Sequence, residues 1–86
     1  MTGGRGTSML AVVYSNGNQE SKRAISLLQT LNAQILEYQL NGEFTQRGFE
    51  AEFGTEAEYP QINIGNKHVG GLKETMNYLK QEGKLE

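Results

Sequence analysis

The sequence contains no cysteine and only one proline among its 86 residues. Without cysteine the chain cannot form a disulfide, bind a metal through sulfur or use a thiol as a nucleophile. Its single histidine, His68, has no companion ligands nearby in sequence. A lone histidine of this kind favours a surface or turn position over a metal ligand. The sequence therefore predicts no metal site.

Charge of one sign and long apolar runs are also lacking. Eight basic and ten acidic residues give a net charge of −2, so bulk charge indicates neither nucleic acid nor an anionic membrane as a partner. No apolar run approaches the roughly 20 residues that span a bilayer, and no signal peptide is visible. We expect a cytoplasmic, monomeric protein with one small domain over residues 9–86.

The first eight residues, MTGGRGTS, have no hydrophobic periodicity and are dense in Gly, Ser and Thr. This composition is typical of a flexible leader, or of residues added for expression. We therefore exclude residues 1–8 from the predicted fold and take Met9 as the candidate native start.

The remaining pattern predicts four strands and three helices in the order β-α-β-α-β-β-α. A helix between the first two strands implies a parallel crossover, whereas the short connection between the last two strands requires an antiparallel hairpin. The predicted architecture is therefore α/β, a four-stranded mixed sheet with helices on its faces. The expected elements are strands at 9–14 and 33–40, a hairpin over 61–69, and helices at 18–31, 43–53 and 72–83.

Local signals support each predicted helix. Asn18 is a good N-cap residue for the first helix, which the pattern ends near Asn32. Gly54 suits the C-terminal cap of the second helix, although Gly48 in its interior costs about 1 kcal/mol relative to alanine. The expected buried anchors are Phe44, Phe49 and Phe53 in the second helix and Leu72, Met76 and Leu79 in the third.

The stretch from Thr55 to Leu72 organises the prediction of a binding site. Pro60 precedes an alternating apolar run, and X-Pro is the one bond at which a cis peptide is cheap. Gly65 begins a Gly-Asn turn, and the pair Gly70-Gly71 leads into the last helix, where unshielded N–H groups suit a carboxylate. The competing interpretation is that these residues only shape turns.

Several motifs in this order resemble the glutaredoxin family, which has the thioredoxin fold. Val13-Tyr14-Ser15 resembles the Tyr-Ser at a strand end, and Ser21-Lys22-Arg23-Ala24, followed by Leu27-Leu28, resembles the helix after the family's Cys-x-x-Cys. Tyr59-Pro60-Gln61-Ile62 is similar to the segment that carries the cis-proline. His68-Val69-Gly70-Gly71 resembles the His-Ile-Gly-Gly of the glutathione-binding loop. The resemblance runs from Met9 to the C-terminus.

The chain departs from the family at the positions that carry its chemistry. Asn18 occupies the first cysteine position and Ser21 the second, and the loop before them is one residue shorter than usual. Asn16 replaces a basic residue, and Leu72-Lys73 replaces Cys-Asp. We interpret Ser21 as the replaced reactive cysteine, by engineering or natural loss; the alternative is an ordinary first-turn serine. For Asn18, helix capping alone is a sufficient explanation.

The resemblance implies glutathione as co-substrate and places its contacts. Tyr59, before Pro60, would pair with the tripeptide backbone, and the amides of Leu72 and Lys73 after Gly70-Gly71 would receive the γ-glutamyl carboxylate. Other candidate contacts are Arg47 or Gln46 for the glycine carboxylate, Lys22 or Arg23 for positive field, and Tyr14 as a site wall. For Arg47 and Lys73 the alternative is an ordinary solvated surface residue.

The leading functional hypothesis is a glutaredoxin, a glutathione-dependent thiol–disulfide oxidoreductase, in a form that is inactive because it lacks the thiol. Its partners, by family analogy, would be glutathionylated or disulfide-containing proteins such as ribonucleotide reductase. The alternative is a redox-dead module that binds glutathione or a protein in the same groove. A purely structural interaction domain ranks last.

Overall fold

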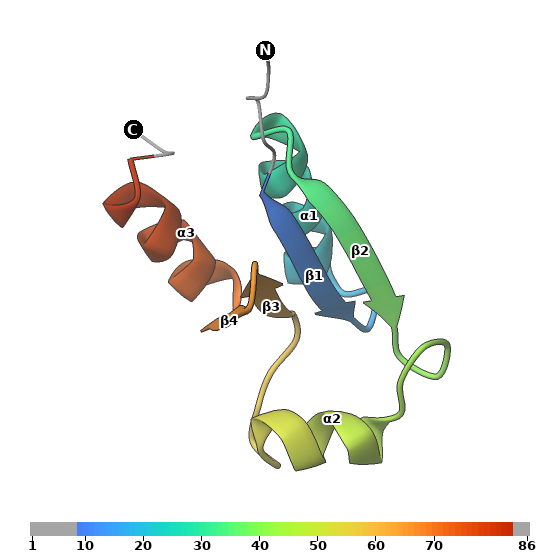
Figure 1. Ribbon diagram of the computed structural model, residues 1–86. Coiled ribbons are helices and arrows are strands. Elements are labelled where there is room, and N and C mark those ends of the chain that lie inside the picture. The colour runs from blue at the N-terminus through green and yellow to red at the C-terminus, as the bar shows by residue number, and fades with distance from the viewer. Residues whose placement is uncertain (1–8, 84–86) are drawn as a thin grey trace.

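The computed structural model describes residues 9–83 of the chain, and the expected leader over residues 1–8 lies outside them. Four strands form one mixed sheet in the order β2-β1-β3-β4 (Figure 1). Strand β1 is parallel to β2, whereas β3 is antiparallel to both β1 and β4. The elements are β1 (Leu10–Ser15), α1 (Gln19–Thr30), β2 (Gln34–Gln39), α2 (Gln46–Phe53), β3 (Gln61–Ile64), β4 (Lys67–Gly70) and α3 (Leu72–Gln81).

This element order and sheet topology confirm the predicted α/β, thioredoxin-like fold. Helices α1 and α3 contact each other and the sheet, and the core lies between them and the strands. Because successive strand residues point to opposite faces, Ala11 and Val13 are fully buried while Leu10 is 41% exposed. The core consists of Ala11, Val13, Ala24, Leu28, Ile62, Ile64 and Leu79.

Helix α2 is placed differently from the prediction, which put the helices on the sheet faces. It crosses beyond the ends of β1 and β2 (Figure 1). Aromatic contacts hold it there, in edge-to-face geometry: the Tyr14 ring lies 5.0 Å between centroids from Phe53 of α2, and 5.2 Å from Phe44 in the segment before the helix. Such pairs are worth about 0.5–1.5 kcal/mol beyond the area they bury. The position of α2 therefore depends on rings that lie near the strand ends.

The observed caps explain where the helices begin and end. As predicted, Asn18 caps α1 by accepting a hydrogen bond from the N–H of Ser21, and the helix ends before Asn32. Asn32 has the left-handed conformation, with φ 59°. Helix α2 begins at Gln46 and not at Glu43, because the Thr45 side chain accepts the N–H of Gly48. The interior position that we predicted for Gly48 is therefore wrong, since this glycine lies in the first turn.

The buried face of α3 also corrects the prediction. Thr75 and Leu79 are fully buried and Leu72 packs against the core, whereas Met76 is 43% exposed. The buried positions are thus spaced three and four residues apart, as on any helix face, but the middle one is a threonine. Because Thr75 is polar, the sequence pattern did not mark it as buried, and the prediction assigned the buried position to Met76 instead.

Phe49 gives a direct test of how α2 is held. It is 1% exposed, and its ring stacks on Tyr59 at 4.2 Å between centroids. We expect Phe49→Ala to reduce the free energy of unfolding by about 3–5 kcal/mol, because it leaves a cavity and removes the stack. Urea denaturation measures this value. Phe49→Leu is the control: it also removes the ring stack but keeps most of the apolar volume, so it should cost clearly less. Equal losses for the two variants would contradict the expected contribution of the cavity.

Candidate functional site

A groove of about 710 Å³ lies between the Tyr59–Pro60 turn and helix α3. It contains the two segments that the sequence singled out, the proline turn and the glycine pair. The backbone passes close there, because a Cβ built on Gly71 would lie 3.4 Å from the carbonyl oxygen of Pro60. The lining residues are Glu20, Glu58, Tyr59, Pro60, Gln61, Gly70, Gly71, Leu72, Lys73, Glu74, Met76, Asn77 and Lys80.

The start of α1 meets this groove at Tyr59. The Tyr59–Pro60 peptide bond is cis, in agreement with the interpretation of the sequence. The Asn18 side chain donates from Nδ2 to the carbonyl oxygen of Tyr59 at 3.3 Å, across 41 residues of sequence. The helix N-terminus and the proline turn therefore meet at this point.

Asn18 is exposed and satisfies two groups with one side chain. Its Oδ1 accepts the N–H of Ser21 at 2.8 Å, which caps α1, while its Nδ2 holds Tyr59. The preceding loop is tightened by Asn16, whose Oδ1 accepts the N–H of Asn18 at 3.0 Å. Residue 18 thus stands at the positive end of the helix dipole, beside the groove.

Ser21 lies in a different environment. It is fully buried, and its Oγ makes no hydrogen bond within residues 9–83. A thiol at this position would be shielded from any dissolved disulfide, and burial in apolar surroundings raises a thiol pKa. The interpretation of Ser21 as the reactive position therefore does not fit the structure. Of the two cysteine positions of the family, residue 18 is the accessible one.

The glycine pair shapes the opposite wall of the groove. Gly70 has φ +128°, a conformation that side chains rarely adopt, and a Cβ there would lie 2.9 Å from the Cβ of Glu74. Glu74 in turn accepts the N–H of Gly71 through Oε1 at 3.1 Å. The first-turn N–H groups of α3, at Leu72 and Lys73, have no acceptor within the helix. Leu72 and Lys73 both line the groove.

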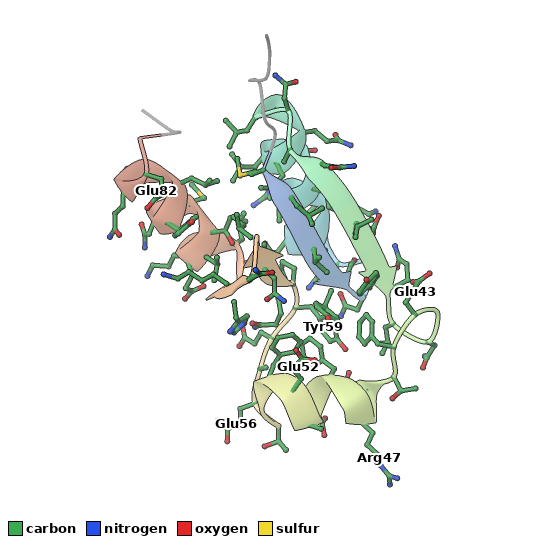
Figure 2. All side chains as sticks on the ribbon, in the orientation of Figure 1. Glu43, Arg47, Glu52, Glu56, Tyr59 and Glu82 are labelled. Atoms are coloured by element: carbon green, nitrogen blue, oxygen red, sulfur yellow. The ribbon has the colours of Figure 1, made fainter. Side chains whose placement is uncertain are left out.

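Other predicted contacts lie away from the groove. Arg47 points away from the rest of the molecule (Figure 2) and does not line it. Gln46 is engaged elsewhere, since it accepts the Tyr59 hydroxyl at 2.6 Å and donates to Glu50 at 2.9 Å. Tyr14 borders a second, smaller cavity. The remaining predicted residues, Lys22 and Arg23, are exposed on α1 and are not part of the lining.

Sequence reasoning missed several residues that do line the groove. Glu20 and Glu58 bring carboxylates to it, and the exposed Met76 adds an apolar wall. The one sequence signal for Glu58 is its position directly before Tyr59, which was already a candidate site residue. Three glutamates and two lysines line the groove, so it presents both signs of charge.

Tyr59 is held rigidly on the α2 side of the groove. Its ring stacks on Phe49, and its hydroxyl donates to Gln46. Burial, and then the nearby Glu50 carboxylate, raise the pKa of the Tyr59 phenol above its ordinary value of 10.0. The phenol is therefore neutral at pH 7 and serves as a donor. Helix α2 thus fixes the residue that precedes Pro60.

The described part of the chain shows neither a metal site nor a membrane-spanning helix. Within residues 9–83, no group of three or more His, Asp or Glu side chains is arranged to hold a metal ion. His68 instead pairs through Nε2 with Gln61 Oε1 at 2.7 Å. None of the helices described there has the length and apolar character needed to cross a membrane.

Comparisons with known proteins add no relative. No family model matches the sequence, and no curated protein matches it significantly. The glutaredoxin resemblance therefore stays a prediction, carried by the motifs and their order.

Gly70 tests the geometry of the groove wall. We expect Gly70→Ala to lower the free energy of unfolding by about 1–3 kcal/mol, because it combines an unfavourable φ with a clash against Glu74. Gly48→Ala is the matched control: its added Cβ meets only the Thr45 Oγ1, at 3.4 Å. That variant should be neutral or slightly more stable. Thermal and urea unfolding measure both, and an unaffected Gly70→Ala protein would contradict the described conformation.

Proposed function

We propose that this chain is a glutaredoxin-like domain that binds glutathione in the groove beside Tyr59 and Pro60, and that it lacks thiol–disulfide exchange because Asn18 and Ser21 replace the cysteines. The observation that carries the proposal is the contact between the exposed cap of α1 and the residue before a cis-proline, at 3.3 Å. That contact brings a helix N-terminus, a turn and a groove together at one place.

The groove has groups that suit each part of glutathione. Its volume of about 710 Å³ lies within the range of about 300–1,000 Å³ typical of small-molecule sites. The backbone of Tyr59 can pair with an extended peptide, and the amides at Leu72 and Lys73 suit the γ-glutamyl carboxylate. Lys73 removes the acidic partner that the family uses for the amino group. Glu20 and Glu58 line the same groove and offer carboxylates in its place.

A thiol at position 18 would be activated by its place in the fold. The N–H groups at the start of α1 and the helix dipole stabilise a thiolate and lower its pKa from about 8.5. Such a thiolate attacks a glutathione mixed disulfide, forms the new S–S bond and releases the partner's thiolate. Asparagine has no such chemistry, and a serine alkoxide is too basic to form without a base. The chain as given is therefore expected to be inactive.

A pair of variants tests the proposal. Asn18→Cys should give a thiol with a pKa below about 8.5 and glutathione-dependent reduction of a small mixed disulfide, at a cost of about 0.5–2 kcal/mol for the lost cap. Ser21→Cys is the matched control, because it adds the same thiol at a fully buried position. Its thiol should react far more slowly with a soluble disulfide reagent.

The rate of thiol modification as a function of pH gives the thiol pKa, and a coupled assay measures the glutathione-dependent reduction of the mixed disulfide. An Asn18→Cys thiol that titrates near 8.5 with no reductase activity would count against the proposal. So would a Ser21→Cys thiol that is the more reactive of the two.

The second candidate is a redox-dead module that docks an extended protein segment in the groove. The observation in its favour is that Asn18 satisfies both the helix end and Tyr59 without any thiol. The half-exposed Met76 in the groove wall also suits an apolar side chain of such a segment. For the glutaredoxin-like candidate, glutathionylated or disulfide-containing proteins such as ribonucleotide reductase are partners by family analogy alone.

A further inference from the structure

A second cavity of about 220 Å³ lies where β1, β2 and α2 meet, and it shares no lining residue with the groove. Four of its lining residues are aromatic, two are glutamates and one is a glycine. They are Tyr14, Tyr38, Phe44, Phe49, Glu43, Glu52 and Gly48. The proposed glutathione site uses none of these residues, so the cavity is considered independently of that proposal.

The rings come together because of the strand register. Tyr14 and Tyr38 are direct partners in the parallel pair of β1 and β2, and their rings meet edge to face at 5.3 Å between centroids. Phe44 adds a third ring, 5.2 Å from Tyr14. All three side chains are only partly buried, so ring surface borders the cavity. Aromatic faces carry partial negative charge and attract organic cations.

The charged groups of the cavity have one sign. Glu43 and Glu52 line it, and among residues 9–83 no lysine, arginine or histidine does. Glu43 is fixed in place, since its Oε1 accepts the N–H of Gln39 at 2.7 Å. The Glu52 charge reaches the cavity wall, because after burial it is the main cause that raises the pKa of Tyr14 above 10.0. Arg47, on the same helix, points away from this region (Figure 2).

We propose that this cavity binds the guanidinium group of an arginine side chain presented by a partner protein. A guanidinium is planar, stacks on aromatic rings and donates forked hydrogen bonds to carboxylates, so it matches both kinds of lining group. A cavity of 220 Å³ is below the range for drug-sized ligands but suits one side chain. Residues 43–58 also contain five glutamates and one arginine, a charge that attracts a basic segment.

The test titrates an acetylated and amidated glycine peptide with one central arginine against the native chain, followed by amide and aromatic-ring chemical shifts. The expected result is saturable shifts at Tyr14, Tyr38 and Phe44 that weaken as salt is added. A peptide with neutral citrulline in place of arginine has the same shape and should give no saturable shifts. A lysine peptide should bind less tightly than the arginine peptide.

Charge variants distinguish an effect of the carboxylates that line this cavity from a general effect of negative charge on the protein. Glu52→Gln should weaken the arginine peptide about tenfold, a loss equivalent to about 1.4 kcal/mol. Glu56→Gln removes the same charge from a residue that does not line the cavity, and it should change the affinity less than twofold. Equal effects of the two variants, equal binding of the citrulline peptide, or shifts confined to residues outside the cavity would overturn the proposal.

Discussion

One side chain holds together the two parts of the fold on which the candidate site depends. Asn18 caps α1 through its oxygen and holds the carbonyl of Tyr59 through its nitrogen, so the helix N-terminus and the proline turn are fixed against each other. An N-cap is worth about 0.5–2 kcal/mol on its own. The second bond spans 41 residues of sequence and converts a local capping preference into a tertiary constraint. This junction fixes the N-terminus of α1 against the Tyr59–Pro60 turn, which forms one wall of the groove beside α3.

Helix α2 supports the same junction from the other side. Phe49 stacks on the ring of Tyr59, and Gln46 accepts its hydroxyl, so the residue before Pro60 is held from both ends. The aromatic cluster that places α2 beyond the strand ends also encloses the second cavity, through Tyr14 and Tyr38. The aromatic packing around α2 thus contributes to two separate concave surfaces, the groove and the second cavity. One has both signs of charge, whereas the other combines aromatic rings with the carboxylates of Glu43 and Glu52.

Much of the fold follows from local signals, and the errors have identifiable physical causes. The strand pattern, the Asn18 cap and the X-Pro turn predicted the element order and the cis bond, because each depends on neighbours in sequence. Burial at a single position does not depend on sequence neighbours alone. Thr75 is buried and Met76 is exposed, because packing against the core sets the rotation of α3 about its axis. The same limit applies at the site. The resemblance to the glutaredoxins assigned the family's two cysteines to positions 18 and 21, but only tertiary structure distinguishes the exposed residue 18 from the buried Ser21.

The most direct measurement of the central claim is a titration of the native chain with reduced glutathione, followed by backbone amide shifts. The account predicts saturable changes at Tyr59, Gly71 and Leu72, where the turn and the start of α3 face the groove. The dipeptide Cys-Gly lacks the γ-glutamyl carboxylate and should leave Leu72 unchanged while still moving Tyr59. Glutathione that moves none of these three amides at saturating concentration would contradict the account, whatever the fold.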